Sequence, residues 1–591
     1  MVGLESGVDV GQFGARRDSA RNLLGYIALR RQDIRVIQER LSTMGISSLG
    51  RSESHVLYNI DAVIAILQRL AGAPVEGPTV PGGVSPLQGK EILERNADAL
   101  FGSGEPGRSV RIMVTMPSEA AADYFLVRDL VAAGMDCMRI NCAHDSEREW
   151  LLMVKNLRRA EVEVGRKCRV LMDIAGPKLR TGELEPGPQV LRLKPKRDGF
   201  GHVISPALVV LAAEGTKEPP ADGSVPILEV EAEWLGKLQD EGEITLVDSR
   251  GSRRTLNVQV GRNGQVTAES EKTLYLDPST KLGLECEGEV FSTTITNLPF
   301  QEDPIRLKKG DSLLITEGQE PGRNADRHGP ARVPCTLPEA LRFVGVGERV
   351  WLDDGKIGCV VKSVSEGEIK VEVTHAVEEG EKLRADKGIN IPDTDLKLPP
   401  LTSKDVQDLQ FIVQHADMVG YSFVRSPEDL KMLRTELARY GKKDMGIILK
   451  IETSKAFEQL PSLLLESMRG PLSGVMVARG DLAVECGYER LAEVQEEILW
   501  MSEAAHMPTI WATQVLEGLT KNGIPSRAEV TDAAMGGRSE CVMLNKGPHI
   551  VEALRALDNI LRRMQDHQVK KRSMMRRLNI ASRFLRGTSK D

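Results

Sequence analysis

The chain has 591 residues and carries 78 Lys and Arg against 85 Asp and Glu, which gives a formal net charge of −7. Hydrophobic residues make up 41% and charged residues 28%, which is the composition of a large folded protein and excludes both a disordered chain and a small disulfide-stapled scaffold. The acidic balance excludes a general attraction to nucleic acid or to anionic membranes, and no apolar run reaches the ~20 residues of a membrane span. We therefore expect a cytoplasmic protein that acts on small molecules.

Residues 1–107 predict a helical extension that ends in a linker. Apolar residues recur at three- and four-residue spacing in the stretches 23–41 and 55–72, as they do on one face of an α-helix. The stretch 72–89 is rich in Pro and Gly and is typical of a linker. Because the region holds no recognisable chemistry, we expect it to pack against the body of the protein or to contact another subunit.

From Val110 onward, short apolar runs alternate with amphipathic stretches, a pattern typical of a parallel sheet built from β-strands and α-helices in turn. The eight runs are RIMVTM (111–116), CMRINCAH (137–144), CRVLMDIAG (168–176), MVGYSFVRS (418–426), GIILKIET (446–453), GVMVARGDL (474–482), TIWATQV (509–515) and CVMLNKG (541–547). They lie in the segments 108–182 and 396–566, which together have nearly the ~250 residues of a (β/α)8 barrel. The sequence therefore predicts an α/β protein with a TIM barrel.

The two barrel segments are separated by residues 183–395, which resemble strands and turns, for example in GERVWLDDGKIGCVVKSVSEGEIKVEV. We expect this insertion after the third barrel strand to form a β-rich lid domain of its own. Residues 567–591 form a basic tail with eight Lys and Arg and one Asp. We expect the tail to be a frayed helix against the acidic body, and contact with a membrane or an acidic partner is the alternative.

Polar residues follow several of the predicted strands, where the active site of a (β/α)8 barrel lies. The residues are Arg139, Asn141 and His144; Asp173, Lys178 and Arg180; Lys450 and Glu452; Arg479 and Asp481; and Thr513 and Gln514. A single residue of this kind would be explained by a surface ion pair, but five strands that end in this way favour a functional site.

The residue types at these strand ends indicate phosphoryl transfer. Glu452 and Asp481 follow neighbouring strands, so their carboxylates could share one divalent cation, Mg²⁺ or Mn²⁺, whose other ligands are substrate and water. Arg139 and Arg180 offer planar guanidinium groups that suit phosphate, and Lys450 offers a compact positive charge beside the metal. Cations and a metal without an obvious nucleophile are typical of a reaction that relies on positioning and charge neutralisation.

The turn at Gly480 predicts a second kind of anion site. Small residues there leave backbone N–H groups accessible at the start of the helix that Asp481 opens. A substrate carboxylate would fit at this position.

Several of these segments resemble motifs of the pyruvate kinase family. MRINCAHDS is similar to that family's RLNFSHGS, MDIAGPKLRTG to LDTKGPEIRTG, VWLDDGKI to YVDDGLI and DKGINIP to KKGVNLP. Together with DKGINIP, the long and specific matches are LKIET to SKIEN, VARGDLAVE to VARGDLGVE, and WATQVLEGLTKNGIPSRAEVTD to CATQMLESMTSNPRPTRAEVSD. The resemblance runs in order from about Val110 to His549 and implies a barrel with a mobile β lid inserted after the third strand.

The resemblance implies the glycolytic reaction of phosphoenolpyruvate and ADP to pyruvate and ATP. By this resemblance, Lys450 would stabilise the phosphoryl group during its transfer, and Thr513 would take part in protonating the enolate. Arg139 would bind the phosphate of phosphoenolpyruvate. Glu452 and Asp481 would be the Mg²⁺ ligands. The substrate-binding residues would be Arg139, Lys450, Gly480, Asp481 and Thr513, and the nucleotide-binding residues would be Asn141, His144, Arg180, Asp354 and Lys387.

The monovalent-cation site of the family is altered in this chain. Its Asn, Ser, Asp and Thr are here Asn141, Ala143, Asp173 and Ile174. A hydroxyl is lost at Ala143, whereas the backbone carbonyl of Ile174 could replace that of Thr. The Glu found five positions after the Asp is Lys178, whose ammonium could stand in for potassium. We therefore predict an activity that does not require K⁺.

Three further departures concern regulation and turnover. Ala175 replaces a Lys near the substrates, and the family's VMLSGETAKG is shortened to VMLNKG at 542–547. No counterpart of the family's C-terminal α/β domain is found in the sequence, so we expect an enzyme without the usual allosteric domain. A homo-oligomer, either a dimer or a tetramer, is expected.

Two other functions remain open at the level of the sequence. One is a catalytically weak paralogue kept as a binding or regulatory module. The other is a barrel enzyme that uses Mg²⁺ to stabilise the enolate of pyruvate in aldol chemistry. Retention of Lys450, Glu452, Asp481, Thr513 and Arg139 together argues against the first, because a purely structural descendant has no physical need for this set.

Overall fold

The computed structural model describes residues 9–74, 83–215, 225–261, 264–286, 288–327, 329–470, 472–565, 567–570 and 572–573. Most of the basic tail expected at 567–591 and part of the linker expected at 72–89 lie outside the described residues. The chain divides into two compact units. The first unit comprises Met1–Arg180, Leu337–Ile369 and Gly388–Asp591, and the second comprises Thr181–Thr336 and Lys370–Lys387.

Eight parallel strands of the first unit close into a barrel, in the order in which they follow along the chain. They are β1 (Arg111–Thr115), β2 (Cys137–Asn141), β3 (Arg169–Asp173), β25 (Met418–Tyr421), β26 (Gly446–Ile451), β27 (Ser473–Ala478), β28 (Thr509–Ala512) and β29 (Cys541–Leu544). The barrel closes where β1 pairs with β29. The predicted α/β barrel is confirmed, and each strand lies within the apolar run from which it was predicted, except that β27 begins one residue earlier, at Ser473.

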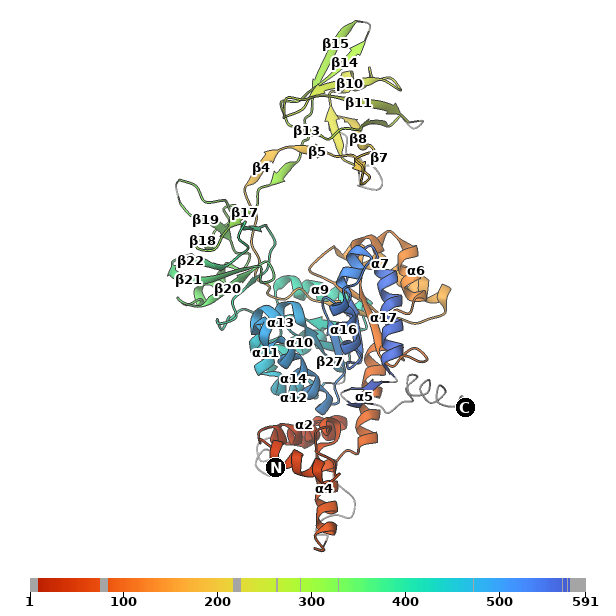
Figure 1. Cartoon of the computed structure of the whole chain (residues 1–591), viewed down its shortest axis with the longest axis vertical. Helices are drawn as coiled ribbons and strands as arrows, with labels where there is room; N and C mark the ends of the chain where they lie inside the picture. Colours follow the sequence, from red (N-terminus) through yellow and green to blue (C-terminus); the bar gives the residue numbers. More distant parts are fainter. Residues whose placement is uncertain are drawn as a thin grey trace, which may run out of the picture. The chain divides into compact units, whose positions relative to one another are not determined.

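Helices surround the barrel (Figure 1). They are η3 (Ser118–Ala121), α6 (Tyr124–Ala132), α7 (Glu147–Val164), α9 (Ser403–His415), α10 (Pro427–Arg439), α11 (Ser454–Glu458), α12 (Leu460–Ser467), α13 (Arg479–Cys486), η5 (Tyr488–Arg490), α14 (Leu491–Ala504), α15 (Glu517–Asn522), α16 (Arg527–Gly536) and α17 (Ile550–Gln565). Local sequence sets where several begin: Thr402, Ser426 and Ser526 each cap a helix through a capping box with the acidic residue three positions later.

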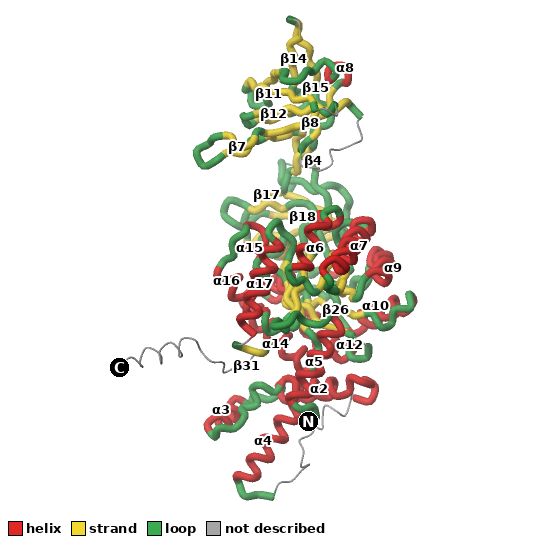
Figure 2. Tube along the Cα trace, turned by 90° about the vertical axis from the view of Figure 1, so that its right-hand side faces the viewer, coloured by secondary structure: helices red, strands yellow, loops and turns green. Residues whose placement is uncertain are grey.

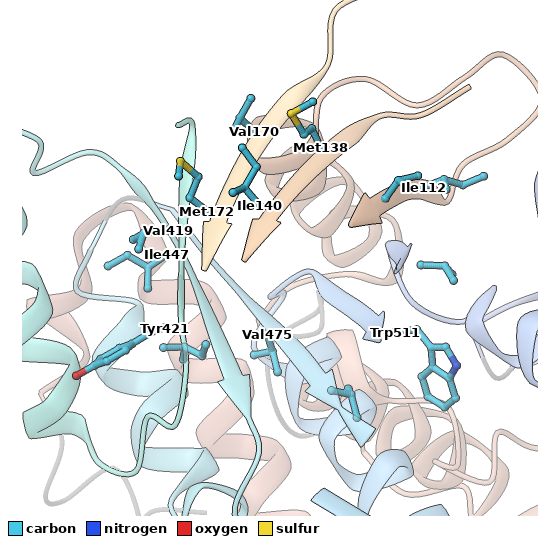
Figure 3. Close-up of a cluster of buried hydrophobic side chains, with 14 of the residues drawn as sticks. Ile112, Met138, Ile140, Val170, Met172, Val419, Tyr421, Ile447, Val475 and Trp511 are labelled. Carbon is cyan, nitrogen blue, oxygen red and sulfur yellow. The ribbon is translucent and has the colours of Figure 1, made fainter. Parts of the chain in front are cut away.

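Side chains alternate along each barrel strand between two apolar layers, because successive residues of a strand point to opposite faces. One layer packs against the surrounding helices. Figure 3 shows members of this layer: Ile112, Met138, Ile140, Val170, Met172, Val419, Tyr421, Ile447, Val475 and Trp511. The other layer contains alternate residues of all eight strands, which meet only inside the barrel: Met113, Cys137, Leu171, Met418, Ile448, Met476, Ile510, Ala512, Cys541 and Met543.

Helix α5 (Pro86–Phe101) closes the N-terminal end of the barrel. Its Ala97, Leu100 and Phe101 are buried in the interior layer, and Figure 2 shows the helix next to the barrel strands. A Cβ on Gly446 would lie 3.0 Å from Leu100, so the glycine leaves room for this contact. The helix begins inside the stretch predicted as a linker, because Ser85 caps it and a proline suits its first turn.

The rest of the N-terminal extension is helical, as predicted, and packs on the barrel through a buried polar cluster. Its elements are η1 (Val10–Arg16), α2 (Arg17–Arg30), α3 (Arg35–Thr43), η2 (Glu53–His55) and α4 (Val56–Leu70). His506, in the loop before β28, donates from Nε2 to the carbonyl of Ser54 and accepts the hydroxyl of Ser19 at Nδ1, both at 2.9 Å. Burial lowers the pKa of His506, which keeps the ring neutral for these two contacts.

Three strands from the predicted insertion belong to the barrel unit. They are β20 (Arg349–Leu352), β21 (Ile357–Ser365) and β24 (Ile389–Asn390), and β20 pairs antiparallel with each of the other two. Residues 337–369 are thus grouped with the barrel, whereas the sequence assigned all of 183–395 to one lid domain. The strand β22 (Glu368–His375) crosses the boundary between the two units along the chain.

The second unit is rich in β-strands and has its own hydrophobic core. Its largest sheet has the order β15-β14-β10-β11-β12-β8-β9, and its core includes Trp234, Leu256 and Leu282. The elements are β4 (Pro186–Gln189), β5 (Leu191–Leu193), β6 (Lys196–Arg197), β7 (Val203–Ser205), β8 (Ala207–Ala213), β9 (Ile227–Val230), α8 (Ala232–Leu235), β10 (Glu243–Val247), β11 (Arg253–Val260), β12 (Val266–Ser270), β13 (Leu274–Leu276), β14 (Lys281–Cys286), β15 (Glu289–Thr294), β16 (Phe300–Glu302), β17 (Ile305–Leu307), β18 (Ser312–Thr316), β19 (Ala331–Pro334) and β23 (Glu381–Leu383). In the described residues of both units, no helix is long and apolar enough to cross a lipid bilayer.

Candidate active site

Polar side chains occupy the inward-facing positions at the C-terminal ends of the barrel strands. Thr115, Arg139 and Asp173 end β1, β2 and β3 or lie near their ends, and Lys450 is the last inward residue of β26. Each lies two residues after a member of the apolar interior layer, so the alternation that seals the base of the barrel also turns these groups inward. The barrel interior is therefore apolar at one end and charged at the other.

Arg139 and Asp173 form a buried ion pair. Nε and Nη2 of Arg139 donate to Oδ2 of Asp173 at 2.9 and 2.7 Å, and Nη1 donates to the hydroxyl of Thr115 at 3.0 Å. Burial by itself would raise the pKa of Asp173, but the positive charges of Arg139 and Lys450 lower it below its usual value. The aspartate is thus held ionised, and its other oxygen, Oδ1, accepts no hydrogen bond.

Lys450 lies between two buried carboxylates. Its Nζ is 3.0 Å from Oε1 of Glu452 and 3.4 Å from Oδ2 of Asp173, and it donates to the hydroxyl of Ser422 at 2.7 Å. Burial would lower the pKa of Lys450, but the carboxylates of Glu452 and Asp173 raise it above its usual value. The ammonium group therefore stays charged at neutral pH.

Glu452 and Asp481 lie close enough for their charges to interact. Burial raises the pKa of Glu452, and although Lys450 opposes this rise, the negative charge of Asp481 adds to it. Oε2 of Glu452 accepts the backbone N–H of Phe423 at 2.6 Å, and Oδ1 of Asp481 is 2.8 Å from Nζ of Lys178. Two neighbouring carboxylates that repel each other favour the binding of a cation between them, because the cation relieves this repulsion.

This donor set fits Mg²⁺ shared with a substrate. Throughout the described residues, no three His, Cys, Asp or Glu side chains converge so that they could hold a metal by themselves. Mg²⁺ is often held by one or two carboxylates with substrate and water oxygens as the other ligands. Glu452 and Asp481 would hold the ion in this way.

Thr513 lies in a turn directly after β28, next to the start of α13. Its hydroxyl accepts the backbone N–H of Gly480 at 2.9 Å. Both Thr513 and Gln514 have left-handed backbone angles, with φ of 65° and 56°. The structure thus brings together Gly480, Asp481 and Thr513 from two neighbouring strand ends.

The residues predicted to bind the nucleotide belong to both units. Asn141 ends β2 and accepts the N–H of Ala143 at its side-chain oxygen, and His144 is exposed in the loop that follows. Arg180 forms a backbone bridge with Gly388. Asp354 is exposed in the turn between β20 and β21, where φ is 54°.

Two other predicted positions are held by backbone contacts. Lys387 belongs to the second unit and is anchored there by its backbone to Thr181. Ile174 is buried beside Asp173, and its N–H donates to the carbonyl of Gly420 at 3.0 Å. The roles of all these positions stay predictions.

Three groups of the charged cluster were not singled out from the sequence. They are the hydroxyls of Thr115 and Ser422 and the backbone N–H of Phe423. The sequence holds a signal for them, because Ser422 and Phe423 directly follow β25 within the run 418–426, and Thr115 lies at the end of β1 within the run 111–116.

The sequence of this barrel is similar to that of known proteins. The family model "Pyruvate kinase, barrel domain" matches residues 107–207 and 237–548. The pyruvate kinase of Bacillus licheniformis is 32% identical over 274 residues, which are 45% of this chain and 45% of that protein. The pyruvate kinase of Thermotoga maritima is 32% identical over 268 residues, 44% of this chain and 54% of that protein.

A pyruvate kinase of Mycobacterium intracellulare is 29% identical over 335 residues, 56% of this chain and 68% of that protein. The matches thus span from just under half to about two thirds of the length of these relatives. The family match covers more than half of the chain and all eight barrel strands. The chain therefore belongs to the pyruvate kinase family.

Proposed function

We propose that the chain transfers a phosphoryl group from phosphoenolpyruvate to ADP and so forms pyruvate and ATP, with Mg²⁺ or Mn²⁺ as cofactor. The observation that carries the proposal is the buried chain of charges Arg139, Asp173, Lys450 and Glu452, next to Asp481 at the C-terminal end of the barrel. Family membership supports the same reaction class. A cluster of this kind would be costly to keep for stability alone, because buried ion pairs contribute little net stability.

Each residue has a role that follows from its charge and place. Lys450 stays protonated between two carboxylates, so it would stabilise the negative charge of the phosphoryl group as it moves. Arg139 would present its planar guanidinium to the phosphate. Mg²⁺ bound by Glu452 and Asp481 would supply further charge neutralisation.

The turns after β27 and β28 would bind the carboxylate of the substrate and supply the proton of the product. The backbone N–H groups at the start of α13, near Gly480, would hold the carboxylate. Thr513, beside them, would take part in protonating the enolate through its hydroxyl. Asn141, His144, Arg180, Asp354 and Lys387 would contact the nucleotide.

The proposed enzyme does not require K⁺. Lys178 lies 2.8 Å from Asp481, so a fixed ammonium group is already present beside the carboxylate that would bind the metal. Its ammonium would replace the monovalent cation at the site to which Asn141, Asp173 and Ile174 belong. A cytoplasmic location and a homo-oligomer are part of the same proposal.

The test is the formation of pyruvate by the purified chain from phosphoenolpyruvate, ADP and Mg²⁺, in K⁺ and in Na⁺ buffer. We expect wild-type activity that differs by less than about twofold between the two buffers. Lys450→Met and Glu452→Gln should each lower kcat by about 10²-fold or more, because each removes charge stabilisation at the reacting group. Lys431→Met, on the exposed face of α10, is the matched control and should leave kcat unchanged.

Each other outcome would contradict one part of the proposal. An inactive wild type would favour the binding module, and pyruvate consumption with an aldehyde but no use of ADP would favour aldol chemistry. Equal rates for the wild type and Lys450→Met would remove the role of Lys450. Strong stimulation by K⁺ would disprove the substitution by Lys178.

A further inference from the structure

The turn that carries Thr513 has an unusual backbone. Thr513, Gln514 and Leu516 have φ of 65°, 56° and 50°, the left-handed region that residues with a side chain rarely adopt. Non-glycine residues persist in this region only where the surrounding structure holds them. The position of the Thr513 hydroxyl therefore depends on the side chains that stabilise this turn.

The guanidinium of Arg479 binds the backbone of the turn. Its Nε donates to the carbonyl of Ala512 at 2.8 Å, and its Nη2 donates to the carbonyl of Thr513. Arg479 directly precedes Gly480, whose N–H donates to the Thr513 hydroxyl at 2.9 Å. The start of α13 thus contacts Thr513 at both its backbone and its side chain.

Two further side chains fix the guanidinium itself. Asp532 on α16 forms a two-point ion pair with Arg479, of which the Nη2–Oδ2 distance is 2.8 Å. The indole of Trp511 stacks on the guanidinium at 4.5 Å, and its Nε1 lies 3.3 Å from Oδ1 of Asp532.

We propose that Arg479 is a positioning residue that acts through Thr513, and that Asp532 and Trp511 hold it in place. The proposal rests on the proposed function, since it assigns Arg479 a part in the step that Thr513 serves. The donors of Arg479 point to backbone carbonyls and to Asp532, so the side chain positions the reacting group and does not bind the substrate. Arg479 also connects the start of α13 to the Thr513 turn through its hydrogen bonds.

The test is the variant Arg479→Lys. A lysine keeps the charge, but its ammonium cannot span two carbonyls and a carboxylate as the planar guanidinium does. We expect kcat for pyruvate formation to fall about 30- to 100-fold, as for a displacement of ~1 Å at a reacting group. The KM values for phosphoenolpyruvate and ADP should change less than about threefold, because Arg139 and Glu452, which would bind the phosphate and the metal, lie on β2 and directly after β26.

Arg538→Lys is the matched control. Arg538 pairs with Glu496 near the opposite end of the barrel, and its side chain is 10% exposed, like that of Arg479. Both variants should lower the melting temperature by similar amounts, but Arg538→Lys should leave kcat within about twofold of the wild type. An equal loss of kcat in the control would overturn the proposal, because a general loss of stability would then explain both.

A double-variant cycle with Thr513→Ala provides the decisive readout. If Arg479 acts through Thr513, Arg479→Lys should lower kcat less than about threefold further in the Thr513→Ala background. If the kcat of the double variant falls by the product of the two single-variant losses, Arg479 acts independently of Thr513 and the proposal is overturned. An active wild type with an unaffected Arg479→Lys variant defeats this proposal alone, whereas an inactive wild type defeats the proposed function and this inference with it.

Discussion

Charged side chains at the end of the barrel are buried only in contact with opposite charges. Lys450 contacts Asp173 and Glu452, and Asp173 also pairs with Arg139. Removing one partner from such a set leaves an uncompensated buried charge, which costs about 3–5 kcal/mol of stability. Substitutions in the cluster should therefore be judged by kcat together with stability.

Glu485 is a partly buried carboxylate on α13, four residues after Asp481, and its pH response can be predicted. Burial raises its pKa to about 7, and its Oε1 accepts a hydrogen bond from Nδ2 of Asn390 at 3.1 Å. Because the folded-state pKa lies above the usual value of 4.5, the stability that the neutral form provides is complete below about pH 4.5. It is lost as the pH rises to about 7, with a slope of at most ~1.4 kcal/mol per pH unit.

The variant Glu485→Gln should remove this dependence, since an amide oxygen can still accept from Asn390. Urea unfolding in the presence of a chelator should give the variant a stability advantage that grows between pH 4.5 and 7 and then stays constant. Glu497→Gln, at an exposed position of α14, is the control and should show a flat difference. A Glu485→Gln advantage that does not change with pH would contradict the assignment.

At the scale of elements, α5 is the part of the N-terminal extension that completes the barrel. The barrel strands leave an apolar interior layer open at their N-terminal ends, and Ala97, Leu100 and Phe101 cover it. Only one face of α5 is used in this way, because Leu87 on the same helix is 74% exposed. The helix therefore covers the N-terminal end of the barrel core.

Leu100→Ala should lower the free energy of unfolding by about 2–5 kcal/mol, because it leaves a cavity in the closed end of the barrel. Leu100 is 2% exposed and contacts several strands through the interior layer. Leu87→Ala should change stability by less than about 0.5 kcal/mol. Chemical denaturation of both variants measures the difference, and equal effects would show that α5 does not seal the barrel.

At the scale of the whole molecule, the barrel and the largest sheet of the second unit have separate hydrophobic cores. The barrel core and the core around Trp234 and Leu256 share no residue among those that the structure describes. Units with separate cores can unfold in separate transitions, so one stability value does not describe the whole chain.

Leu256→Ala should lower the melting temperature of one calorimetric transition and leave the other unchanged. Leu256 is fully buried in the core of the second unit, so its truncation should cost about 2–5 kcal/mol there. Leu208→Ala, 38% exposed on the same sheet, is the control. A single transition that shifts as a whole would mean that the units unfold together.

The sequence by itself determined the barrel and most of its charged end. The alternation of side chains along each strand and the order of the strands follow from local patterns of apolar residues. All eight strands form in the runs that those patterns predict. The same periodicity places Arg139, Asp173 and Lys450 on inward-facing positions. These features could be predicted because each depends on residues that are near one another in the chain.

The tertiary structure alone decided which groups complete the site and what closes the barrel. Arg479 directly follows β27, and Lys450 lies near the end of β26, but the side chain of Arg479 turns to Asp532 and to the Thr513 turn, which are more than thirty positions away in the sequence. Helix α5 has a weak apolar pattern and a proline at its start, and only its packing on the interior layer of the barrel reveals its role. The physical reason is the same in both cases: side-chain direction and partner choice depend on groups that are distant in sequence and become neighbours only when the barrel closes.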